Sequence, residues 1–292
     1  SESGIDQIGL TDDNGTLSFA FRKRQGSGNL IDPESTDKAL VLHTSGTTSR
    51  PKRVPLSHGN LTQSVDNIVK TYQLTDQDVS FCVMPLFHVH GLVASVLATL
   101  SSGGTIVLPG KFNPMRFWPV LAEYRATWYS AVPSIHQALL NRMRRDQRKP
   151  EGLDNLRFIR SCSSALPPAT MLEMEKILQI PVLEAYGMTE ASHQMSSNPL
   201  PPGKRMAGTV GQGTGVEVAT MSDSGKLLEP GERGEVVIKG ANVTLGYENN
   251  KEANKSSFTD GWFRTGDEGI IDQQHYLTLV GRIKELINRS GE

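Results

Sequence analysis

The sequence contains few cysteines and no long apolar run. Cys82 and Cys162 are the only cysteines among 292 residues, and neither belongs to a Cys-x-x-Cys pair. A disulfide framework and a thiolate metal site are therefore excluded as organising features. No apolar stretch reaches the ~20 residues that cross a bilayer, and the N-terminus lacks the basic and apolar regions of a signal peptide. We expect no membrane span and an intracellular compartment, cytoplasmic or peroxisomal.

The sequence also lacks a charge excess of either sign. It has 30 Lys and Arg against 31 Asp and Glu, a formal net charge of -1. Nothing in this balance favours nucleic acid as a partner. A chain of 292 residues with 37% hydrophobic residues can bury a large core, as an ordinary globular protein does. These properties favour chemistry on small molecules and leave the oligomeric state open.

The hydrophobic pattern changes along the chain. Between residues 80 and 200, short apolar runs alternate with helical stretches, which is typical of a layered α/β unit with a mainly parallel sheet. In 201–282, short strands between Gly, Pro, Asn and Asp turns predict a smaller antiparallel, barrel-like sheet. Residues 1–79 combine a polar entry segment with a strand at 39–42 that we expect to be buried on both faces. Residues 283–292 are interpreted as a hinge stub.

Individual elements can be placed on this pattern. Short apolar runs predict strands at 81–84, 105–108, 128–132, 158–162 and 182–185. Helical periodicity predicts helices at 61–72, 90–100, 117–124, 135–145 and 168–178. The chain starts without Met and stops directly after a strand-like, charged segment. We interpret both ends as cuts in a longer protein.

A hydroxyl-rich loop follows the strand at 39–42. Residues 44–52 contain five hydroxyl side chains, a glycine and two cations. Hydroxyl and backbone N–H groups can donate to phosphate oxygens, Gly46 permits close backbone approach, and Lys52 can neutralise charge. A solvated Ser/Thr turn is the simpler alternative. A Walker loop is excluded, because Pro51 precedes the lysine and a strand is expected to follow.

This segment resembles the phosphate loop of the adenylate-forming superfamily, which includes acyl-CoA synthetases, luciferases and peptide-synthetase adenylation domains. The resemblance implies a catalytic role for Lys52 and nucleotide contacts from Thr44, Ser45, Gly46, Thr47 and Thr48. Arg53 departs from the pattern, in which a glycine normally follows the lysine. Because arginine lacks the freedom of glycine at positive φ, we expect altered loop mobility or turnover.

A second motif reads Glu-Ala-Tyr-Gly-Met-Thr-Glu over residues 184–190. An aromatic face can stack on a purine, and a carboxylate can hold Mg²⁺ against phosphate oxygens. Taken singly, Tyr186 suits a core aromatic and Glu190 a surface charge. In this order the residues are similar to the Tyr-Gly-x-Thr-Glu motif of the superfamily. The resemblance implies catalysis by Thr189 and Glu190, Mg²⁺ on Glu190, and nucleotide contacts from Glu184, Ala185, Tyr186 and Gly187.

Asp267 and Arg282 lie near the C-terminal end, in Thr-Gly-Asp and Val-Gly-Arg segments that also suit ordinary turns. A carboxylate can accept hydrogen bonds from two vicinal hydroxyl groups. The resemblance implies that Asp267 binds the ribose and that Arg282 assists it. It also places the hinge of the superfamily at Lys284 and a catalytic lysine in a C-terminal domain beyond residue 292, so we expect this chain alone to be incomplete for full turnover.

Two imidazoles lie two residues apart at His88 and His90. They could form a metal pair, but no third ligand has a suitable spacing, and a structural role is the simpler alternative for each. The resemblance implies that His88 lies at the acyl channel, with a catalytic role, and that His90 lines the acid pocket. It also implies that Ser163, Ser164 and Ala165 wall the nucleotide site. With His90, His136 and His193, Ser163 would form a small polar pocket for a compact dicarboxylate.

From about Asp37 to Glu292 the amino-acid sequence of these segments closely resembles that of oxalate-CoA ligases of plants and fungi. That resemblance implies an acid-thiol ligase that uses ATP and Mg²⁺ to convert a small carboxylic acid into an acyl-adenylate and then, with coenzyme A, into a thioester. The expected partners are therefore ATP, CoA and a carboxylate. Two alternatives stay open. One is a different acyl- or aryl-CoA ligase, and the other is a non-catalytic nucleotide-binding module, suggested by Arg53 and the cut ends.

Overall fold

The structure is a computed structural model that describes residues 8–13, 16–21, 32–44 and 51–283. The chain forms two compact units, residues 1–34 and 35–292. In the first, β1 (Ile8–Asp13) pairs antiparallel with β2 (Thr16–Phe21). All candidate site residues belong to the second unit.

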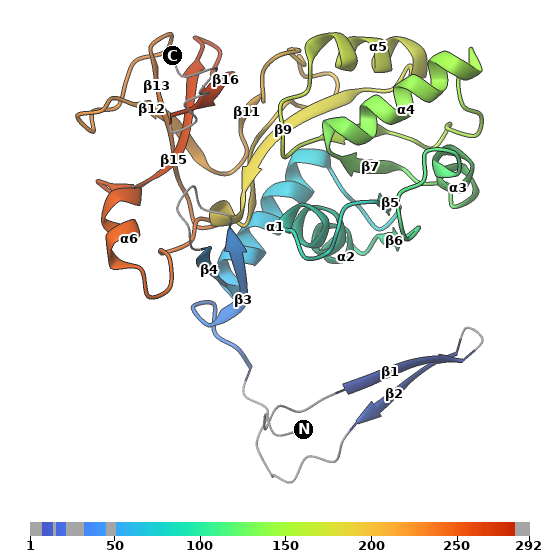
Figure 1. The fold of residues 1–292 in the computed structure, drawn as a ribbon, viewed down its shortest axis with the longest axis horizontal. Coiled ribbons are helices and arrows are strands. Elements are labelled where there is room, and N and C mark those ends of the chain that lie inside the picture. The colour runs from blue at the N-terminus through green and yellow to red at the C-terminus, as the bar shows by residue number, and fades with distance from the viewer. Residues whose placement is uncertain (1–7, 14–15, 22–31, 45–50, 284–292) are drawn as a thin grey trace, which may run out of the picture. The chain divides into compact units, whose positions relative to one another are not determined.

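A seven-stranded sheet forms the centre of the second unit, in the order β11-β10-β9-β8-β7-β5-β6 (Figure 1). The strands from β9 to β6 are parallel, whereas β10 and β11 are antiparallel additions. The predicted, mainly parallel sheet is thus confirmed. Its strands are β5 (Val79–Cys82), β6 (Thr105–Val107), β7 (Trp128–Ala131), β8 (Phe158–Ser161), β9 (Val182–Met188), β10 (His193–Ser197) and β11 (Gln212–Gly213).

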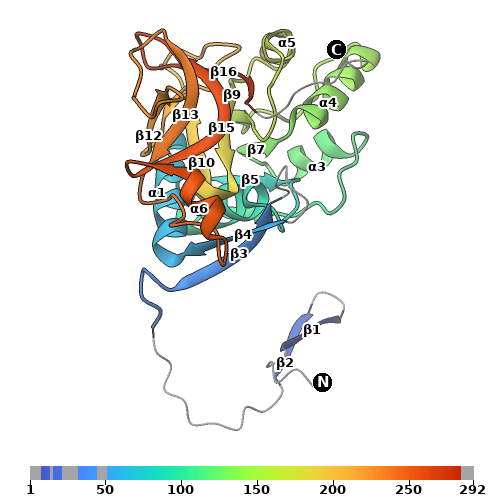
Figure 2. The ribbon, with the colours of Figure 1, turned by 60° about the vertical axis from the view of Figure 1, so that its left-hand side comes forward.

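Helices cover both faces of this sheet (Figures 1 and 2). One layer contains α1 (His58–Tyr72), the π-helix η1 (His90–Leu97) and α2 (Ala98–Ser101), and the other contains α3 (Phe117–Glu123), α4 (Pro133–Asp146) and α5 (Pro168–Leu178). Successive strand residues point to opposite faces. Trp128 and Phe158 therefore join the core that includes α1, whereas Tyr129 and Ile159 join the core that includes α3 to α5.

Helix α1 begins with a capping box. The backbone N–H of Asn60 donates to Ser57 Oγ at 3.1 Å, and the backbone N–H of Ser57 donates to Asn60 Oδ1 at 3.0 Å. These two bonds satisfy N–H groups that a helix start otherwise leaves unpaired.

We expect Ser57→Ala to lower the free energy of unfolding by about 1 kcal/mol, because the cap is lost while the helix interior is unchanged. Urea denaturation would measure this change. Thr62→Ala is the matched control, since Thr62 is an exposed residue of the same helix that makes no cap. An equal loss in both variants would contradict a capping role for Ser57.

The apolar run at 39–42 belongs to β3 (Lys38–Thr44), which pairs antiparallel with β4 (Lys52–Ser57) in a two-stranded sheet of the described chain. Its side chains are exposed or half-buried, so the expected burial on both faces is wrong. Leu40 and Leu42 pack against the core that includes α1, and this one-sided contact is enough to explain the apolar run.

A second, five-stranded sheet is antiparallel throughout, as predicted for 201–282. Its strands are β12 (Glu217–Met221), β13 (Arg233–Lys239), β14 (Phe258–Thr259), β15 (Trp262–Ile271) and β16 (Leu277–Arg282), with helix α6 (Lys251–Ser257) before β14. The Thr-Gly-Asp and Val-Gly-Arg segments therefore lie in paired strands rather than in turns. The division into subdomains at residues 79, 200 and 282 stays an interpretation.

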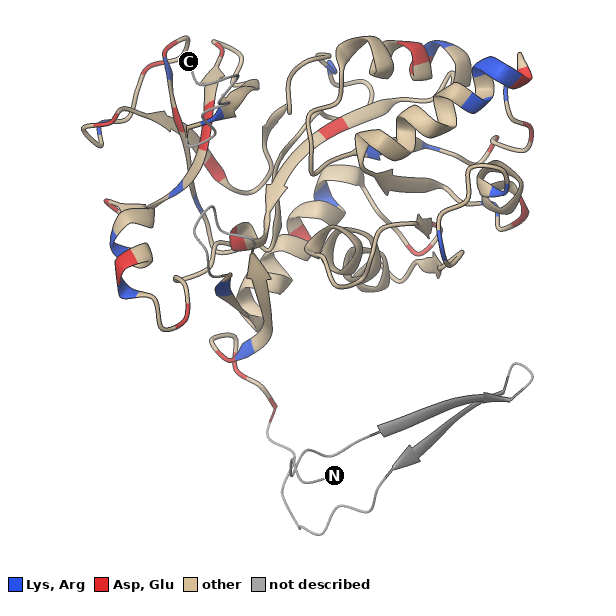
Figure 3. Ribbon diagram, viewed as in Figure 1, with Lys and Arg blue, Asp and Glu red and all other residues tan. Residues whose placement is uncertain are grey.

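Charged residues of both signs are interspersed along the ribbon, in keeping with the near-zero net charge (Figure 3). Among the residues that the structure describes, no helix combines the length and the apolar character that crossing a membrane requires.

Candidate active site

The candidate residues gather around the carboxyl ends of the parallel strands β7, β8 and β9, where open α/β sheets bind their ligands. Arg160 is near the end of β8, and Ser163 follows that strand. Tyr186 lies near the end of β9. After the short 3-10 helix η2 (Thr189–Ala191), the chain turns back into β10, so that His193 lies opposite Met188. One hairpin thus carries both the aromatic motif and His193.

The first group of site residues joins the two large sheets. Tyr186 Oη donates a hydrogen bond to Asp267 Oδ2, and Arg282 Nε donates to Asp267 Oδ1 at 3.0 Å. Asp267 and Arg282 are register partners on β15 and β16. Burial and the adjacent Asp267 charge raise the pKa of Tyr186 well above the usual tyrosine range, so its hydroxyl keeps its proton and donates. The structure therefore brings together an aromatic ring, a carboxylate and a cation.

The second group surrounds Glu190. This side chain is buried, so the simple interpretation as a surface charge is wrong. Tyr247 Oη donates to Glu190 Oε1 at 2.8 Å, and the Nζ atom of Lys52 lies 4.4 Å from the centroid of the Tyr247 ring. Such a cation–π contact holds a lysine near an aromatic face. Thr189 is half-buried in η2, beside Glu190. No motif pointed to Tyr247, whose role follows only from packing.

Lys52 and Thr44 face each other across the β3–β4 hairpin, at the ends of the phosphate-loop segment. Ser45, Gly46, Thr47 and Thr48 lie outside the described residues. Arg53 lies in β4 and is not among the residues with positive φ, so its backbone does not need the conformational freedom of glycine. An effect of Arg53 on loop mobility or turnover stays a prediction. Its Nη2 atom lies 2.9 Å from Glu248 Oε2 in an ion pair at the surface.

The third group centres on Arg160, which is fully buried. Its guanidinium donates to hydroxyl, imidazole and amide groups from α1, β7, η1 and β10. The contacts are Tyr72 Oη at 2.8 Å, Ser130 Oγ at 2.9 Å, His90 Nε2 at 3.5 Å, His193 Nε2 at 2.9 Å and Gln194 Oε1 at 3.0 Å. No carboxylate of the described chain pairs with it. A buried charge is costly unless it is compensated, and here neutral acceptors on four elements surround it.

His90 and His193 lie against this arginine. Their rings stack at a centroid distance of 5.2 Å, and His90 Nδ1 is 2.9 Å from Ser163 Oγ. Burial and the nearby Arg160 cation lower the pKa of both imidazoles well below the usual histidine range, so both rings are neutral. Ser163 and His193 have φ values of 73° and 112°, which is rare for residues with side chains. Such conformations concentrate at functional sites, where the surrounding structure enforces them.

Other predicted residues lie outside this group. His88 is exposed, with its ring centroid 4.5 Å from that of Phe87. His136 lies on the opposite face of the sheet, against Tyr129, where burial lowers its pKa to about 4. It therefore does not contribute to the polar pocket. Ser164 and Ala165 are exposed in the segment after β8. Within the described part of the chain, no group of three or more His, Cys, Asp or Glu side chains is arranged to hold a metal ion.

Glu184 is buried in β9, and the backbone N–H of Leu166 donates to its Oε1 atom at 2.7 Å. Burial raises the pKa of Glu184 to about 7, although the Leu166 hydrogen bond acts in the opposite direction. This carboxyl group therefore changes charge near neutral pH.

The pKa of Glu184 is 4.5 in its ordinary state and about 7 in the folded chain, so folding is favoured by this group below pH 4.5 and loses that contribution as the pH rises to about 7. Glu184→Gln cannot ionise. We expect wild type to lose roughly 3 kcal/mol of unfolding free energy relative to this variant between pH 4.5 and 8. Urea denaturation across this range would measure the difference. Glu151→Gln, at an exposed position, should show no such divergence. Parallel pH curves for wild type and Glu184→Gln would contradict the raised pKa.

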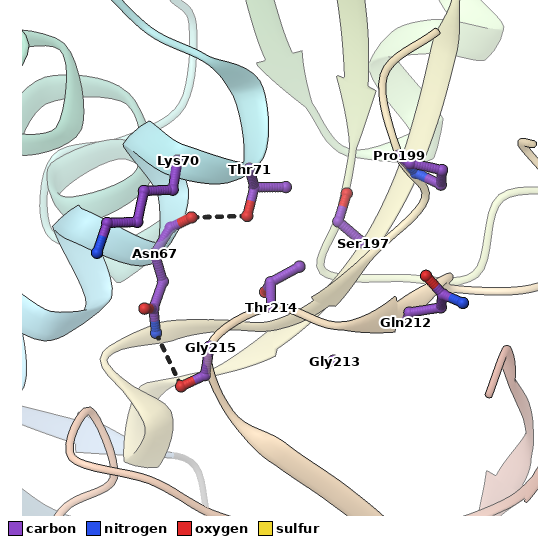
Figure 4. A pocket seen from close by; sticks show the side chains of 9 residues that line it. All are labelled: Asn67, Lys70, Thr71, Ser197, Pro199, Gln212, Gly213, Thr214 and Gly215. Carbon is purple, nitrogen blue, oxygen red and sulfur yellow. Dashed lines mark hydrogen bonds between the residues drawn. The ribbon is translucent and has the colours of Figure 1, made fainter. Parts of the chain in front are cut away.

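A separate polar pocket of about 350 Å³ lies between α1 and the β10 and β11 strands (Figure 4). Its lining consists of Asn67, Lys70, Thr71, Ser197, Pro199, Gln212, Gly213, Thr214 and Gly215, none of which was predicted as a site residue. Gln194 Nε2 donates to Thr71 Oγ1 at 3.4 Å and to Thr214 Oγ1 at 3.2 Å, while Gln194 Oε1 accepts from Arg160. Gln194 thus lies between this pocket and the Arg160 group.

Four residues of the Arg160 group were missed by reasoning from the sequence, namely Tyr72, Ser130, Gln194 and Arg160 itself as a functional centre. One signal was available. Strands of a parallel sheet are buried on both faces and are normally apolar throughout. An arginine in the Phe-Ile-Arg-Ser strand therefore indicates that buried polar side chains accept hydrogen bonds from it.

The structure combines a layered α/β unit, which carries the aromatic motif of residues 184–190, with an antiparallel sheet, which carries Asp267 and Arg282. This combination is typical of a nucleotide-binding class of enzyme. Residues 7–248 match the AMP-binding enzyme family, and the chain belongs to that family. This assignment confirms both the predicted superfamily and the predicted fold class.

Curated relatives agree with this assignment. The chain is 55% identical over 260 residues to an oxalate–CoA ligase of Saccharomyces cerevisiae, which covers 88% of this chain and 47% of that protein. It is 54% identical over 260 residues to an oxalate–CoA ligase of Arabidopsis thaliana, with 88% and 50% covered. The chain thus spans about half the length of the curated relatives it matches.

Solved structures share the fold. ATP-bound MatB from Rhodopseudomonas palustris superposes with a TM-score of 0.82 at 36% identity, covering 88% of this chain and 50% of that one. The O-succinylbenzoate coenzyme A synthetase of Bacillus subtilis in complex with AMP gives a TM-score of 0.79 at 31% identity, with 89% and 52% covered.

Proposed function

We propose that this chain is the nucleotide- and acid-binding core of an acid-thiol ligase that activates a short dicarboxylate, such as oxalate, with ATP and transfers it to coenzyme A. Its membership of the AMP-binding enzyme family and its similarity to two oxalate–CoA ligases support the reaction class. The preference for a dicarboxylate has a separate physical basis in the acid pocket.

That basis is the buried positive charge of Arg160. Each of its N–H groups has a neutral acceptor, so the guanidinium keeps its net charge without offering a free donor. His90 lies between this charge and the exposed hydroxyl of Ser163. An acid with a second carboxylate would bring a compensating negative charge to this site, whereas an aryl or fatty acid would leave the cation uncompensated.

The neighbouring groups support the nucleotide half of the reaction. Asp267 would accept the ribose hydroxyls, with Arg282 beside it, and the face of Tyr186 would stack on adenine. Glu184, Ala185 and Gly187 would line the base, with Ser164 and Ala165 at the opposite wall. Thr44, Thr189 and Lys52 would contact the phosphates. The phosphate-loop residues Ser45, Gly46, Thr47 and Thr48 complete this proposed set.

The carboxylate of Glu190 suits Mg²⁺, because this ion is usually held by one or two protein carboxylates together with substrate phosphates. Glu190 is oriented by the hydroxyl of Tyr247. When bound, the ion would neutralise charge on the triphosphate. His88, exposed in the segment before η1, is proposed to contact the acyl group on its way to the pocket.

In the first step an oxygen of the acid attacks the α-phosphorus of ATP, the new P–O bond forms, and the bond to pyrophosphate breaks. In the second step the CoA thiolate attacks the acyl carbon and AMP leaves. Such chemistry depends on positioning and charge neutralisation rather than on covalent help from the protein. The described residues would supply orientation through Asp267 and Ser163 and positive charge through Lys52 and Arg160.

A panel of acids tests this proposal. The full-length protein would be assayed for AMP and pyrophosphate release with oxalate, malonate and succinate, and with coumarate and a medium-chain fatty acid. We expect turnover with one or more short diacids and at least tenfold lower kcat/KM with the monoacids. Turnover with aryl or fatty acids alone would favour a different acyl-CoA ligase. Nucleotide binding without any acyl-adenylate by mass spectrometry would favour a non-catalytic module.

We further propose an intracellular setting, cytoplasmic or peroxisomal. Both cysteines are free and buried, which agrees with a reducing compartment.

A further inference from the structure

We infer that Arg160 is a positioning residue that fixes the proton of both pocket imidazoles on Nδ1, and that this makes the Ser163 hydroxyl a hydrogen-bond donor toward the acid. Arginine is always protonated and can only donate hydrogen bonds. A permanent donor at the centre of a hydrogen-bond chain sets the direction of every later bond in that chain.

The chain to Ser163 begins at Arg160 Nη1, which donates to Ser130 Oγ at 2.9 Å. Ser130 Oγ lies 2.6 Å from His90 Nε2, and its proton has no other acceptor among the described residues. The same Nη1 atom also lies 3.5 Å from His90 Nε2. A proton on Nε2 would therefore face a second donor, so Nε2 must accept and the proton of His90 must be on Nδ1.

His90 Nδ1 lies 2.9 Å from Ser163 Oγ. With its proton on Nδ1, His90 donates to this oxygen, and the hydroxyl proton of Ser163 is free to point outward. Ser163 is exposed, and its contact with His90 Nδ1 holds the hydroxyl oxygen in place. The chain Arg160 to Ser130 to His90 to Ser163 thus delivers a donor where an acid oxygen would bind.

His193 follows the same rule more directly. Arg160 Nη2 donates to His193 Nε2 at 2.9 Å, so the proton of His193 is on Nδ1. This nitrogen lies next to Gly187, 3.3 Å from the position that a Cβ atom would take there. A side chain at Gly187 would also meet the His193 carbonyl oxygen at 2.1 Å, so only glycine fits beside this imidazole.

Nuclear magnetic resonance tests the tautomers directly. Long-range ¹H–¹⁵N spectra of the ¹⁵N-histidine-labelled chain distinguish a proton on Nδ1 from one on Nε2. Asparagine variants of His90 and His193 assign their signals among the seven histidines. We expect both residues to carry the proton on Nδ1 in wild type. In Arg160→Gln we expect both to shift toward the Nε2 form. A proton on Nε2 in wild type, or unchanged tautomers in Arg160→Gln, would overturn the inference.

Two further variants separate positioning from simple loss of stability. Ser130→Ala removes the donor that lies 2.6 Å from His90 Nε2 and leaves only the longer approach of Arg160 Nη1 at 3.5 Å, so the Nδ1 form of His90 should lose population to the Nε2 form while His193 keeps its proton on Nδ1. This variant also replaces Arg160→Gln as the test if that protein fails to fold. Tyr72→Phe removes the partner of Arg160 Nε and leaves Nη1 and Nη2 in place. Both tautomers should stay unchanged in this control, and a tautomer change equal to that of Arg160→Gln would contradict the directional chain.

If the proposed function holds, the Ser163 donor should affect binding of the acid, and this effect can be measured as a change in KM for the diacid. In the full-length protein we expect Ser130→Ala to raise KM for the diacid about tenfold while KM for ATP changes less than twofold. Equal changes in both constants would contradict a role confined to the acid. If the tautomers are as expected but no diacid supports AMP release, the proposed function fails and the positioning role stands.

Discussion

Glu190→Gln is expected to lower the rate of acyl-adenylate formation in the full-length protein by about 100-fold or more, because a charge that holds Mg²⁺ against the phosphates is worth several kcal/mol in the transition state. Glutamine keeps the size of the side chain and can still accept from Tyr247. The variant therefore removes charge without opening a cavity. Pyrophosphate release at saturating acid and varied Mg²⁺ would measure the change, and we expect the apparent Mg²⁺ requirement to rise.

Tyr247→Phe is the matched control for Glu190. It removes the hydroxyl that donates to Glu190 Oε1 at 2.8 Å and leaves both the carboxylate and the aromatic ring next to Lys52. Loss of a group that only orients a metal ligand typically costs about 10- to 100-fold, so we expect a reduction near 10-fold. If Tyr247→Phe lost as much activity as Glu190→Gln, the carboxylate would not be the group that carries the effect.

Asp267→Asn is expected to raise KM for ATP by about 100-fold, because hydrogen bonds to a charged acceptor contribute roughly 1.5–3 kcal/mol each and the amide cannot accept from two ribose hydroxyls as the carboxylate does. The substitution also weakens the bonds from Tyr186 and Arg282, which join β9 to the antiparallel sheet. Isothermal titration with ATP, and steady-state kinetics with the acid at saturation, would measure the loss.

The neighbouring residue supplies the control for Asp267. Glu268 follows it in β15 and forms an exposed ion pair with Arg233, whose Nη2 atom is 2.5 Å from Glu268 Oε2. Exposed ion pairs contribute little, so Glu268→Gln should leave KM for ATP within twofold of wild type. A comparable loss in both variants would indicate general disruption of β15. An unchanged KM in Asp267→Asn would remove Asp267 from the ribose site.

Much of the parallel sheet could be predicted because buried strands carry continuous apolar runs and the helices between them have a 3.6-residue period. The strands β7 and β8 and the helices α4 and α5 lie within a few residues of the expected positions. The predictions were less accurate where tertiary pairing decided the conformation. Strand β9 extends to Met188, past its expected end at residue 185, because β10 pairs with residues 186–188. Residues 90–97 form a π-helix that begins at His90. Apolar periodicity does not distinguish such a π-helix from an α-helix.

Helix α6 was also missed, because its sequence is polar and lacks an apolar stripe. The side chain of Asn250 caps this helix by accepting from the backbone N–H of Ala253 at 3.1 Å. Arg53 shows the opposite case. Its departure from the family pattern suggested altered loop mobility or turnover, which stays a prediction, whereas the residue itself lies in strand β4 and pairs with Glu248. A side chain that differs from a pattern changes the backbone only where the pattern required an unusual φ.

Short motifs were sufficient to identify the class of this protein, because each nucleotide motif is a run of residues whose spacing can be recognised without a fold. Local apolar patterns also located the strands β5 to β9, although they did not predict that β3 is only partly buried. The surroundings of Arg160 depend instead on the tertiary fold. Arg160 has partners from α1, β7, η1 and β10, as distant in sequence as Tyr72 and Gln194, and no local pattern records such contacts. A buried charge is stabilised by the donors and acceptors that the fold brings around it, and the direction of those hydrogen bonds becomes defined only when all of them are in place.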